Sequence, residues 1–204
     1  MTLSRAVGRG MLWSALESFG STGASFVLSV IMARFLSPQA FGLVAVLQIF
    51  VAVARVFVDS GMTEALIRRA HGTALAYSTA FVLNVSAGVV AYIALWFLAD
   101  PVARFYGNPI LADIMRIMCI GIPLNALCVV QTARLVSAMR FDRLFKVSGT
   151  AVIISGAVGI LMAVKGFGVW ALVWQQVAMW GVRALLLWVL VPGSGRLRFC
   201  RKEA

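Results

Sequence analysis

A short polar stretch at residues 33–43, ARFLSPQAFGL, separates two long apolar runs. The run before it contains one charged residue, Glu17, and the run after it contains Gln48 and Arg55 as its only strongly polar residues. Each run has about the 20 residues that a helix needs to cross the hydrocarbon core of a bilayer. Because Pro38 cannot continue the first helix, this stretch is predicted to be the tip of a transmembrane hairpin.

The same unit recurs along the chain, which has 204 residues, 62% of them hydrophobic and 12% charged. This charged fraction is about half that of an average soluble domain. The pattern predicts an all-α polytopic membrane protein, with a six-helix transmembrane lobe over residues 1–192 and a basic cytoplasmic tail over residues 193–204. The predicted spans are about 11–33, 40–60, 77–99, 109–135, 144–164 and 168–191.

Proline and glycine place the ends and bends of these spans. The third span is expected to end at Asp100-Pro101, and the fourth to start at Pro109, because proline is favoured in the first turn of a helix. Gly121 and Pro123 should kink the fourth span. The sequence KGFG at residues 165–168 predicts a tight hairpin between the last two spans.

Lysine and arginine gather at one set of helix ends. Of the eighteen, twelve lie near the N-terminus, between the second and third spans, between the fourth and fifth, and in the tail, whereas four lie at the opposite ends. Cytoplasmic loops carry the excess of these residues, so both termini are expected in the cytoplasm. The cations form short clusters rather than one basic face, and nucleic acid is therefore not an expected partner.

Polar residues within the spans are the candidates for a substrate cavity, because a charge at that depth is costly unless it is paired or faces water. Gln48 and Arg55 are seven residues apart on the second span, and Gln176 and Arg183 are seven apart on the sixth. Each pair therefore shares one helix face. Asn125, on the fourth span, completes this group of uncharged and cationic candidates.

Glu17 is the candidate acid at the depth of Arg55. It lies about 9 Å from the cytoplasmic end of its span, and Arg55 about 8 Å from the end of the next. A structural ion pair and a charged wall of an aqueous cavity both fit this depth. Arg183 has no obvious acid at its depth, so it either faces a cavity or reaches out to the membrane interface. Arg116, near the outer end, has the planar fork of donors that suits phosphate.

Catalytic and metal-binding motifs are missing from the sequence. The three cysteines and one histidine have no metal-ligand spacing, and there is neither a phosphate-cradling glycine loop nor a catalytic triad. A membrane-embedded glycosyl or phosphoryl transferase would need acids or histidines gathered at one membrane face. Asp59, Glu64, His71 and Asp142 are scattered instead. We expect no enzyme activity, no metal and no cofactor.

Four stretches carry a family resemblance: residues 33–43, 57–69 (FVDSGMTEALIRR), 134–146 (RLVSAMRFDRLFK) and 166–176 (GFGVWALVWQQ). In order and spacing they resemble the N-terminal half of bacterial polysaccharide and lipopolysaccharide biosynthesis flippases of the Wzx/WzxC type. These belong to a larger group that also holds the MATE drug exporters and the MurJ lipid II flippase. The resemblance runs from about residue 5 to the end of the chain.

This resemblance implies a fold of two helical lobes around a central cavity, of which the chain supplies one. Residues 196–202 resemble the start of the linker between lobes. The implied function is transfer of isoprenoid-pyrophosphate-linked oligosaccharide from the cytoplasmic to the outer leaflet of the bacterial plasma (inner) membrane. The implied partners are the lipid bilayer, this lipid-linked substrate, and a second lobe or another copy of the chain.

Two alternatives stay open at this point. A cation-coupled multidrug exporter lobe would use intramembrane acids for coupling, and Glu17 is the one candidate within the spans. A non-transporting membrane scaffold of glycan assembly would show the same hydropathy. Because a substrate site in such transporters lies between two repeats, the chain alone is expected not to transport.

Overall fold

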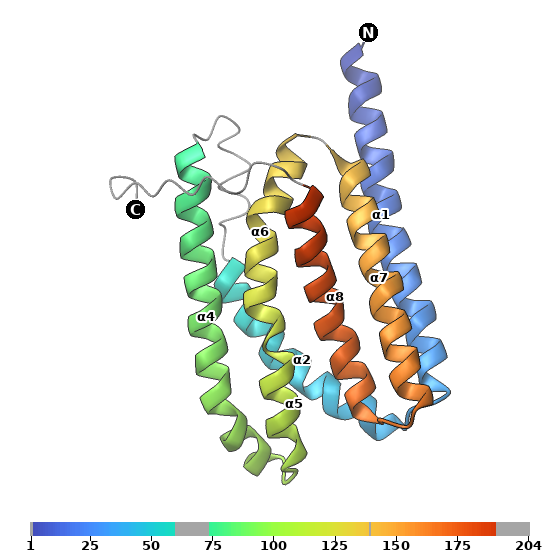
Figure 1. Cartoon of the computed structure of the whole chain (residues 1–204), viewed down its shortest axis with the longest axis vertical. Coiled ribbons are helices and arrows are strands. Elements are labelled where there is room, and N and C mark those ends of the chain that lie inside the picture. The colour runs from blue at the N-terminus through green and yellow to red at the C-terminus, as the bar shows by residue number, and fades with distance from the viewer. Residues whose placement is uncertain (1, 60–73, 139, 191–204) are drawn as a thin grey trace.

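The computed structural model describes residues 2–59, 74–138 and 140–190, with side chains over residues 18–58, 81–138 and 140–190. The described residues form helices joined by short turns. These are α1 (Thr2–Ala33), α2 (Pro38–Asp59), α4 (Ala74–Phe105), α5 (Ile110–Met118), α6 (Gly121–Ser137), α7 (Phe141–Val164) and α8 (Val169–Leu190). Figure 1 shows α4 at one edge of the bundle, α1 beside α7 at the other, and α2 crossing behind the middle helices.

Length and hydropathy make this an all-α polytopic membrane protein. Five segments are long and apolar enough to cross a membrane: Pro38–Val58, Phe81–Phe105, Ile110–Ser137, Phe141–Val164 and Val169–Leu190. In α1 the apolar part with described side chains, Ser18–Ala33, is shorter. The rest of the first expected span lies where side chains are not described, so the count of six spans stays a prediction.

The predicted hairpin tip forms as expected. Helix α1 ends at Ala33 and α2 begins at Pro38. In the turn between them, the N–H of Leu36 donates to the carbonyl of Met32 and that of Ala40 to the carbonyl of Ser37. Proline lacks an N–H, so its place at the first position of α2 costs no helical hydrogen bond.

The expected end of the third span at Asp100-Pro101 is wrong, because α4 continues through Pro101 to Phe105. The helix is instead capped by Gly107, two residues after its end, which has a positive φ of 64°. The N–H of Gly107 donates to the carbonyl of Arg104, and that of Asn108 to the carbonyl of Ala103. This is a Schellman cap, which satisfies carbonyls at the helix end. A proline near the water interface is tolerated because the carbonyl that it frees can be hydrated.

The fourth span is broken where glycine and proline predicted a kink. Helix α5 ends at Met118 and α6 begins at Gly121. The backbone stays hydrogen-bonded across the break, since the N–H of Ile122 donates to the carbonyl of Cys119. Pro123 lies in the first turn of α6, where its missing N–H leaves no interior helical bond unmade. The start of α5 shifts by one residue, with Pro109 as its N-cap.

Small residues set which helices touch. Along α7, a Cβ at Gly156 would lie 2.6 Å from both Cδ atoms of Leu28 in α1. Along α4, a Cβ at Gly88 would lie 3.0 Å from the Cβ of Ala126 in α6. Such close approach of helix backbones is a common way to pack helices in membranes. Thus α1 packs along α7, while α2 lies against α4, α5, α6 and α8.

The helix ends fall into two sets. The turns α1–α2, α4–α5 and α7–α8 lie at the same end of the bundle in Figure 1, and the N-terminus and the α6–α7 connection lie at the other. We call these the turn end and the N-terminal end. At the N-terminal end the guanidinium of Arg143, in α7, donates to the carbonyl of Leu190 at the last residue of α8, at 3.0 Å. A cation at a helix C-terminus is stabilised by the helix dipole.

Candidate functional site

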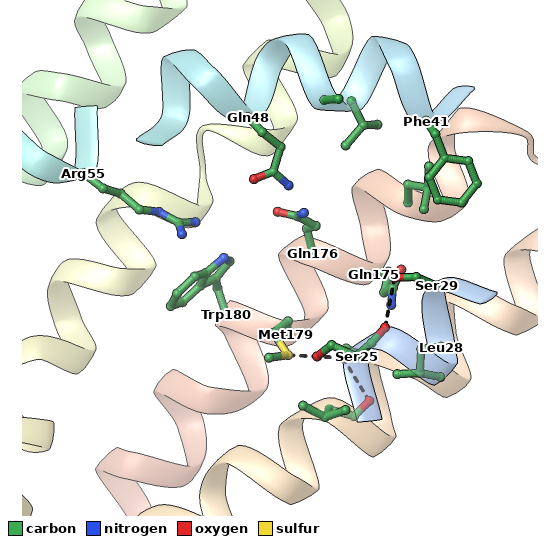
Figure 2. A pocket seen from close by; sticks show the side chains of 15 residues that line it. Ser25, Leu28, Ser29, Phe41, Gln48, Arg55, Gln175, Gln176, Met179 and Trp180 are labelled. Carbon is green, nitrogen blue, oxygen red and sulfur yellow. Dashed lines mark hydrogen bonds between the residues drawn. The ribbon is translucent and has the colours of Figure 1, made fainter. Parts of the chain in front are cut away.

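A cavity of about 460 Å³ lies between α1, α2, α7 and α8 (Figure 2). Its wall combines uncharged polar groups, one arginine and one tryptophan with aliphatic and aromatic side chains. The lining residues are Ser25, Leu28, Ser29, Phe41, Val44, Ala45, Gln48, Arg55, Val152, Ser155, Leu172, Gln175, Gln176, Met179 and Trp180. A pocket of this size, with a few polar groups converging on it, is the usual form of a ligand site.

Arginine and tryptophan form the cationic end of this cavity. The guanidinium carbon of Arg55, on α2, lies 4.2 Å from the ring centroid of Trp180, on α8. The guanidinium carbon of Arg183 lies 5.9 Å from the same ring. Arginine stacks on aromatic faces through its planar, delocalised guanidinium. We call these three residues the arginine–tryptophan group.

The helix break lies against Trp180. A Cβ at Gly121, the first residue of α6, would lie 3.0 Å from Cδ1 of the Trp180 indole. A larger residue at this position would crowd the indole, and the ring or the helix would have to shift by a few tenths of an ångström. The break between α5 and α6 therefore contributes to the site indirectly, because it brings a residue without a side chain against the indole.

Three glutamines occupy the middle of the cavity. Gln48 comes from α2, and Gln175 and Gln176 come from α8. Figure 2 shows the carboxamides of Gln48 and Gln176 pointing toward one another across the cavity. All three side chains are half-buried. Each carboxamide offers two N–H donors and one acceptor oxygen to whatever occupies the space between them.

Hydroxyl groups from α1 and α7 complete the polar lining. Ser25 donates to the carbonyl of Ser21 at 2.8 Å, and Ser29 donates to the carbonyl of Ser25 at 2.9 Å. On α7, Ser155 donates to the carbonyl of Val152 at 3.2 Å. The Ser155 hydroxyl also lies 3.5 Å from the Sδ of Met179 on α8. Since the protons of Ser25 and Ser29 are used within α1, their oxygens present acceptor lone pairs to the cavity.

The structure brings together three of the residues predicted for a cavity: Gln48, Arg55 and Gln176. Arg183 adjoins them through Trp180 but does not line the cavity itself. Its Nε is buried and has no hydrogen-bond partner among the described residues. The role of these residues in binding stays a prediction.

The other two predicted residues have different outcomes. Asn125, in the first half of α6, is half-buried and is not among the residues that line the cavity. Glu17 lies on α1, but its side chain is outside the described part of the structure, so its pairing with Arg55 stays a prediction.

Sequence reasoning missed Trp180. A pattern was available, because Gln176, Trp180 and Arg183 are four and three residues apart, which places them on one helix face. The tryptophans of this span are more readily interpreted as membrane-interface residues, since amphipathic rings prefer that position. Trp180 is instead half-buried and packs inside the bundle.

Arg116, which has the chemistry for phosphate, is already engaged near the turn end. Its Nη2 lies 2.8 Å from both carboxylate oxygens of Asp100. Its Nη1 lies 3.7 Å from Asp113, and its guanidinium carbon 5.2 Å from the ring of Trp96. These partners fix the Arg116 side chain between α4 and α5, away from the cavity. Among the described residues, no group of three or more His, Cys, Asp and Glu side chains is arranged to hold a metal.

Comparison with known proteins agrees with the membrane architecture. Residues 31–204 match the sequence profile of a family described as polysaccharide biosynthesis protein. The chain belongs to this family. The matched region includes all of α2 and of α4 to α8. Three of the four helices around the cavity, α2, α7 and α8, therefore lie within it.

Two named proteins are similar in sequence to part of the chain. The chain is 32% identical over 172 residues to the succinoglycan biosynthesis transport protein ExoT of Rhizobium meliloti (strain 1021), covering 84% of this chain and 35% of the relative. It is 28% identical over 121 residues to the lipopolysaccharide biosynthesis protein WzxC of Escherichia coli (strain K12), covering 59% of this chain and 25% of that relative. The chain thus matches about a third or less of each relative's length. No solved structure matches it significantly.

Proposed function

We propose that this polysaccharide biosynthesis protein is part of a flippase, which moves an isoprenoid-pyrophosphate-linked oligosaccharide from the cytoplasmic to the outer leaflet of the bacterial inner membrane. The observation that carries the proposal is the arginine–tryptophan group beside a polar cavity within the membrane-spanning helices. The named activity of the succinoglycan relative, transport in biosynthesis, supports transport rather than catalysis.

The charge of the group indicates the charge of the substrate. Arg55 is the only charged residue among those that line the cavity in the described part of the chain. Guanidinium groups bind phosphate through paired N–H donors, and a cation within the membrane marks a substrate pathway by default. A pyrophosphate link between lipid and sugar supplies the anionic group that Arg55 and Arg183 would hold.

The proposal places both termini in the cytoplasm, by the count of lysine and arginine at the helix ends. It also includes a second helical lobe or a second copy of this chain. Alternating access needs a site at an interface between two repeats or bundles, and α1, α2, α7 and α8 supply one wall of such a site. The relatives are about three or four times as long as the matched region, which leaves room for the other wall.

The decisive experiment follows the lipid-linked precursor in the host cell. Removing the coding sequence should trap lipid-pyrophosphate-linked oligosaccharide in the cytoplasmic leaflet, and restoring the protein should release it. A protein with Arg183→Ala should fail to restore export. Unchanged leaflet distribution after removal, together with export of lipophilic cations by the wild-type protein, would favour a multidrug exporter instead.

A further inference from the structure

Polar side chains line part of the cavity, and the one charged residue among its lining residues in the described part of the chain, Arg55, lies at one end (Figure 2). Helices α2 and α8 both begin at the turn end and run toward the N-terminal end (Figure 1). On each, a glutamine precedes an arginine by seven residues: Gln48 and Arg55 on α2, Gln176 and Arg183 on α8. On each helix the glutamine therefore lies about 10 Å along the axis nearer to the helix start, at the turn end, than the arginine does.

The amides have hydrogen-bonding capacity that the protein does not use. Within the described residues, the side chains of Gln48, Gln175 and Gln176 make no hydrogen bond with another protein group. An amide in an apolar environment without a partner costs free energy. Three such groups around one cavity are therefore expected to be satisfied by water or by a ligand.

The chemistry of these groups fits saccharide hydroxyls. A hydroxyl donates one hydrogen bond and accepts two, and a carboxamide can do both without bearing a charge. Ser25 and Ser29 add acceptor oxygens on the α1 side of the same space. The stem of Gln175 lies close against Gly159 of α7, since a Cβ added to Gly159 would come within 3.0 Å of its Cβ and Cγ.

We propose that Gln48, Gln175 and Gln176 form a saccharide subsite, distinct from the arginine–tryptophan group, which sets the orientation of the ligand. The sugar lies at the amides, toward the turn end, and the pyrophosphate lies at Arg55, toward the N-terminal end. This inference rests on the proposed function, because it assigns the two parts of the same ligand to two parts of the same cavity.

The proposal separates two contributions to affinity. The anionic group binds at the arginines whether or not a sugar is attached. A sugar adds affinity only where the amides are present, because a site built to hydrogen-bond hydroxyls is left with unpaired groups when they are missing. Substitution of the glutamines should therefore remove the contribution of the sugar and leave that of the anion.

The test measures binding to the purified 204-residue chain in nanodiscs. The probes are farnesyl pyrophosphate and farnesyl pyrophosphate that carries one glucose, galactose or N-acetylglucosamine on its terminal phosphate, each titrated separately. For the wild-type chain, at least one sugar probe should bind about tenfold or more tightly than farnesyl pyrophosphate. Gln48→Leu and Gln176→Leu should each remove most of this difference, with the affinity for farnesyl pyrophosphate unchanged within about twofold.

The matched control is Gln131→Leu. Gln131, on α6, is buried with an unpartnered Oε1 and does not line the cavity, so the same chemical change there should leave both affinities unchanged. Gln176→Asn keeps the amide but shortens the side chain. This variant should retain part of the difference in affinity between the sugar probe and farnesyl pyrophosphate. Leucine in place of an unpartnered amide is not expected to destabilise the fold, which the unfolding temperature of each variant checks.

The outcomes separate the two proposals. If no sugar probe binds more tightly than farnesyl pyrophosphate, or if the glutamine variants weaken both kinds of probe equally, the saccharide subsite is wrong and the anion site stands. If neither kind of probe binds the wild-type chain, the assignment of the pyrophosphate to Arg55 and Arg183, on which the proposed function rests, is wrong.

Discussion

At the scale of single residues, Trp180 organises the two arginines. Its ring lies 4.2 Å from the guanidinium carbon of Arg55 and 5.9 Å from that of Arg183. A cation over an indole is attracted by about 0.5 to 2 kcal/mol, with the larger values where water is excluded. The ring therefore offsets part of the cost of holding two like charges within the membrane, and it does so without neutralising either charge.

The two arginines should respond differently to truncation. Arg183→Ala is expected to reduce flipping while membrane abundance stays at the wild-type level, because Arg183 serves the ligand. Arg55→Ala is expected to reduce both, if Glu17 is its partner, because a buried carboxylate would lose its counter-charge. Quantitative immunoblotting of membranes alongside the leaflet assay measures the two effects. Equal abundance of both variants would contradict the Glu17–Arg55 pair.

A third arginine provides a contrast outside the cavity. Asp100→Asn removes the carboxylate 2.8 Å from Arg116, but the side chains are 55% and 26% exposed. Solvent screening limits such a pair to about 1 kcal/mol or less. We expect a correspondingly small change in the free energy of unfolding in detergent and no change in probe binding. A large gain of affinity for farnesyl pyrophosphate would show that Arg116, once released from Asp100, takes part in anion binding.

At the scale of helices, the contact between α1 and α7 depends on one missing side chain. Gly156→Ala would place a methyl group 2.6 Å from the end of Leu28, so Leu28 or the helix must move. We expect the variant to lose about 1 to 3 kcal/mol of stability relative to Gly149→Ala. Gly149 is on the same helix, and a Cβ added there would have nothing within 4 Å, so alanine at this position should be neutral or slightly stabilising.

A double variant separates packing from helix propensity. If Gly156→Ala destabilises the protein by crowding Leu28, then adding Leu28→Ala to this variant should recover part of the lost stability. The recovered part is the coupling energy between the two contacting residues. Unfolding curves of the two single variants and the double variant supply the measurement. Additive effects would mean that α1 and α7 are not held together at this point.

Much of the helix order follows from the sequence, because it depends on local chemistry. Pro38 begins a helix and Gly121 and Pro123 interrupt one, as their backbone preferences require. The end of α4 was misplaced because Pro101 is a conspicuous helix breaker, whereas Gly107 two residues before Pro109 is the cap that operates.

The site was only partly predictable for a different reason. Periodicity gives the face of a helix and hydropathy gives depth, and together they selected Gln48, Arg55 and Gln176. Neither gives the neighbours of a helix. Long-range packing, such as that of Gly156 against Leu28, decides which helix faces meet. The contact of Trp180 with Gly121 is also a long-range contact of this kind. Asn125 has suitable chemistry and depth, but it does not line the cavity.

At the scale of the whole molecule, the two sets of helix ends lie at opposite ends of the bundle, as a membrane topology requires. The count of cations that predicts the cytoplasmic end relies in part on residues 60–73 and 191–204, which the structure does not describe. Among the described loops and helix ends, Arg134, Arg140, Arg143 and Lys146 cluster around the α6–α7 connection.

Cysteine accessibility in whole cells checks the orientation. In a background without native cysteines, Gln39→Cys and Tyr106→Cys, at the turn end, should react from outside with a thiol reagent that cannot cross the membrane. Ala70→Cys should react only after the cells are permeabilised. The opposite pattern would place both termini outside and remove the basis for the proposed direction of transport.

The pairing of α1 with α7 has a consequence for synthesis in the cell. Leu28 emerges from the ribosome 128 residues before Gly156, the residue that it packs against. At about 5 to 20 residues per second, the first helix waits roughly 6 to 26 s for its partner. During this interval the face of α1 that carries Leu28 has no α7 to pack against, so it contacts lipid, the insertion machinery or another helix. Assembly of the bundle is therefore not strictly in chain order, and the first helix to enter the membrane is among the last to reach its final position.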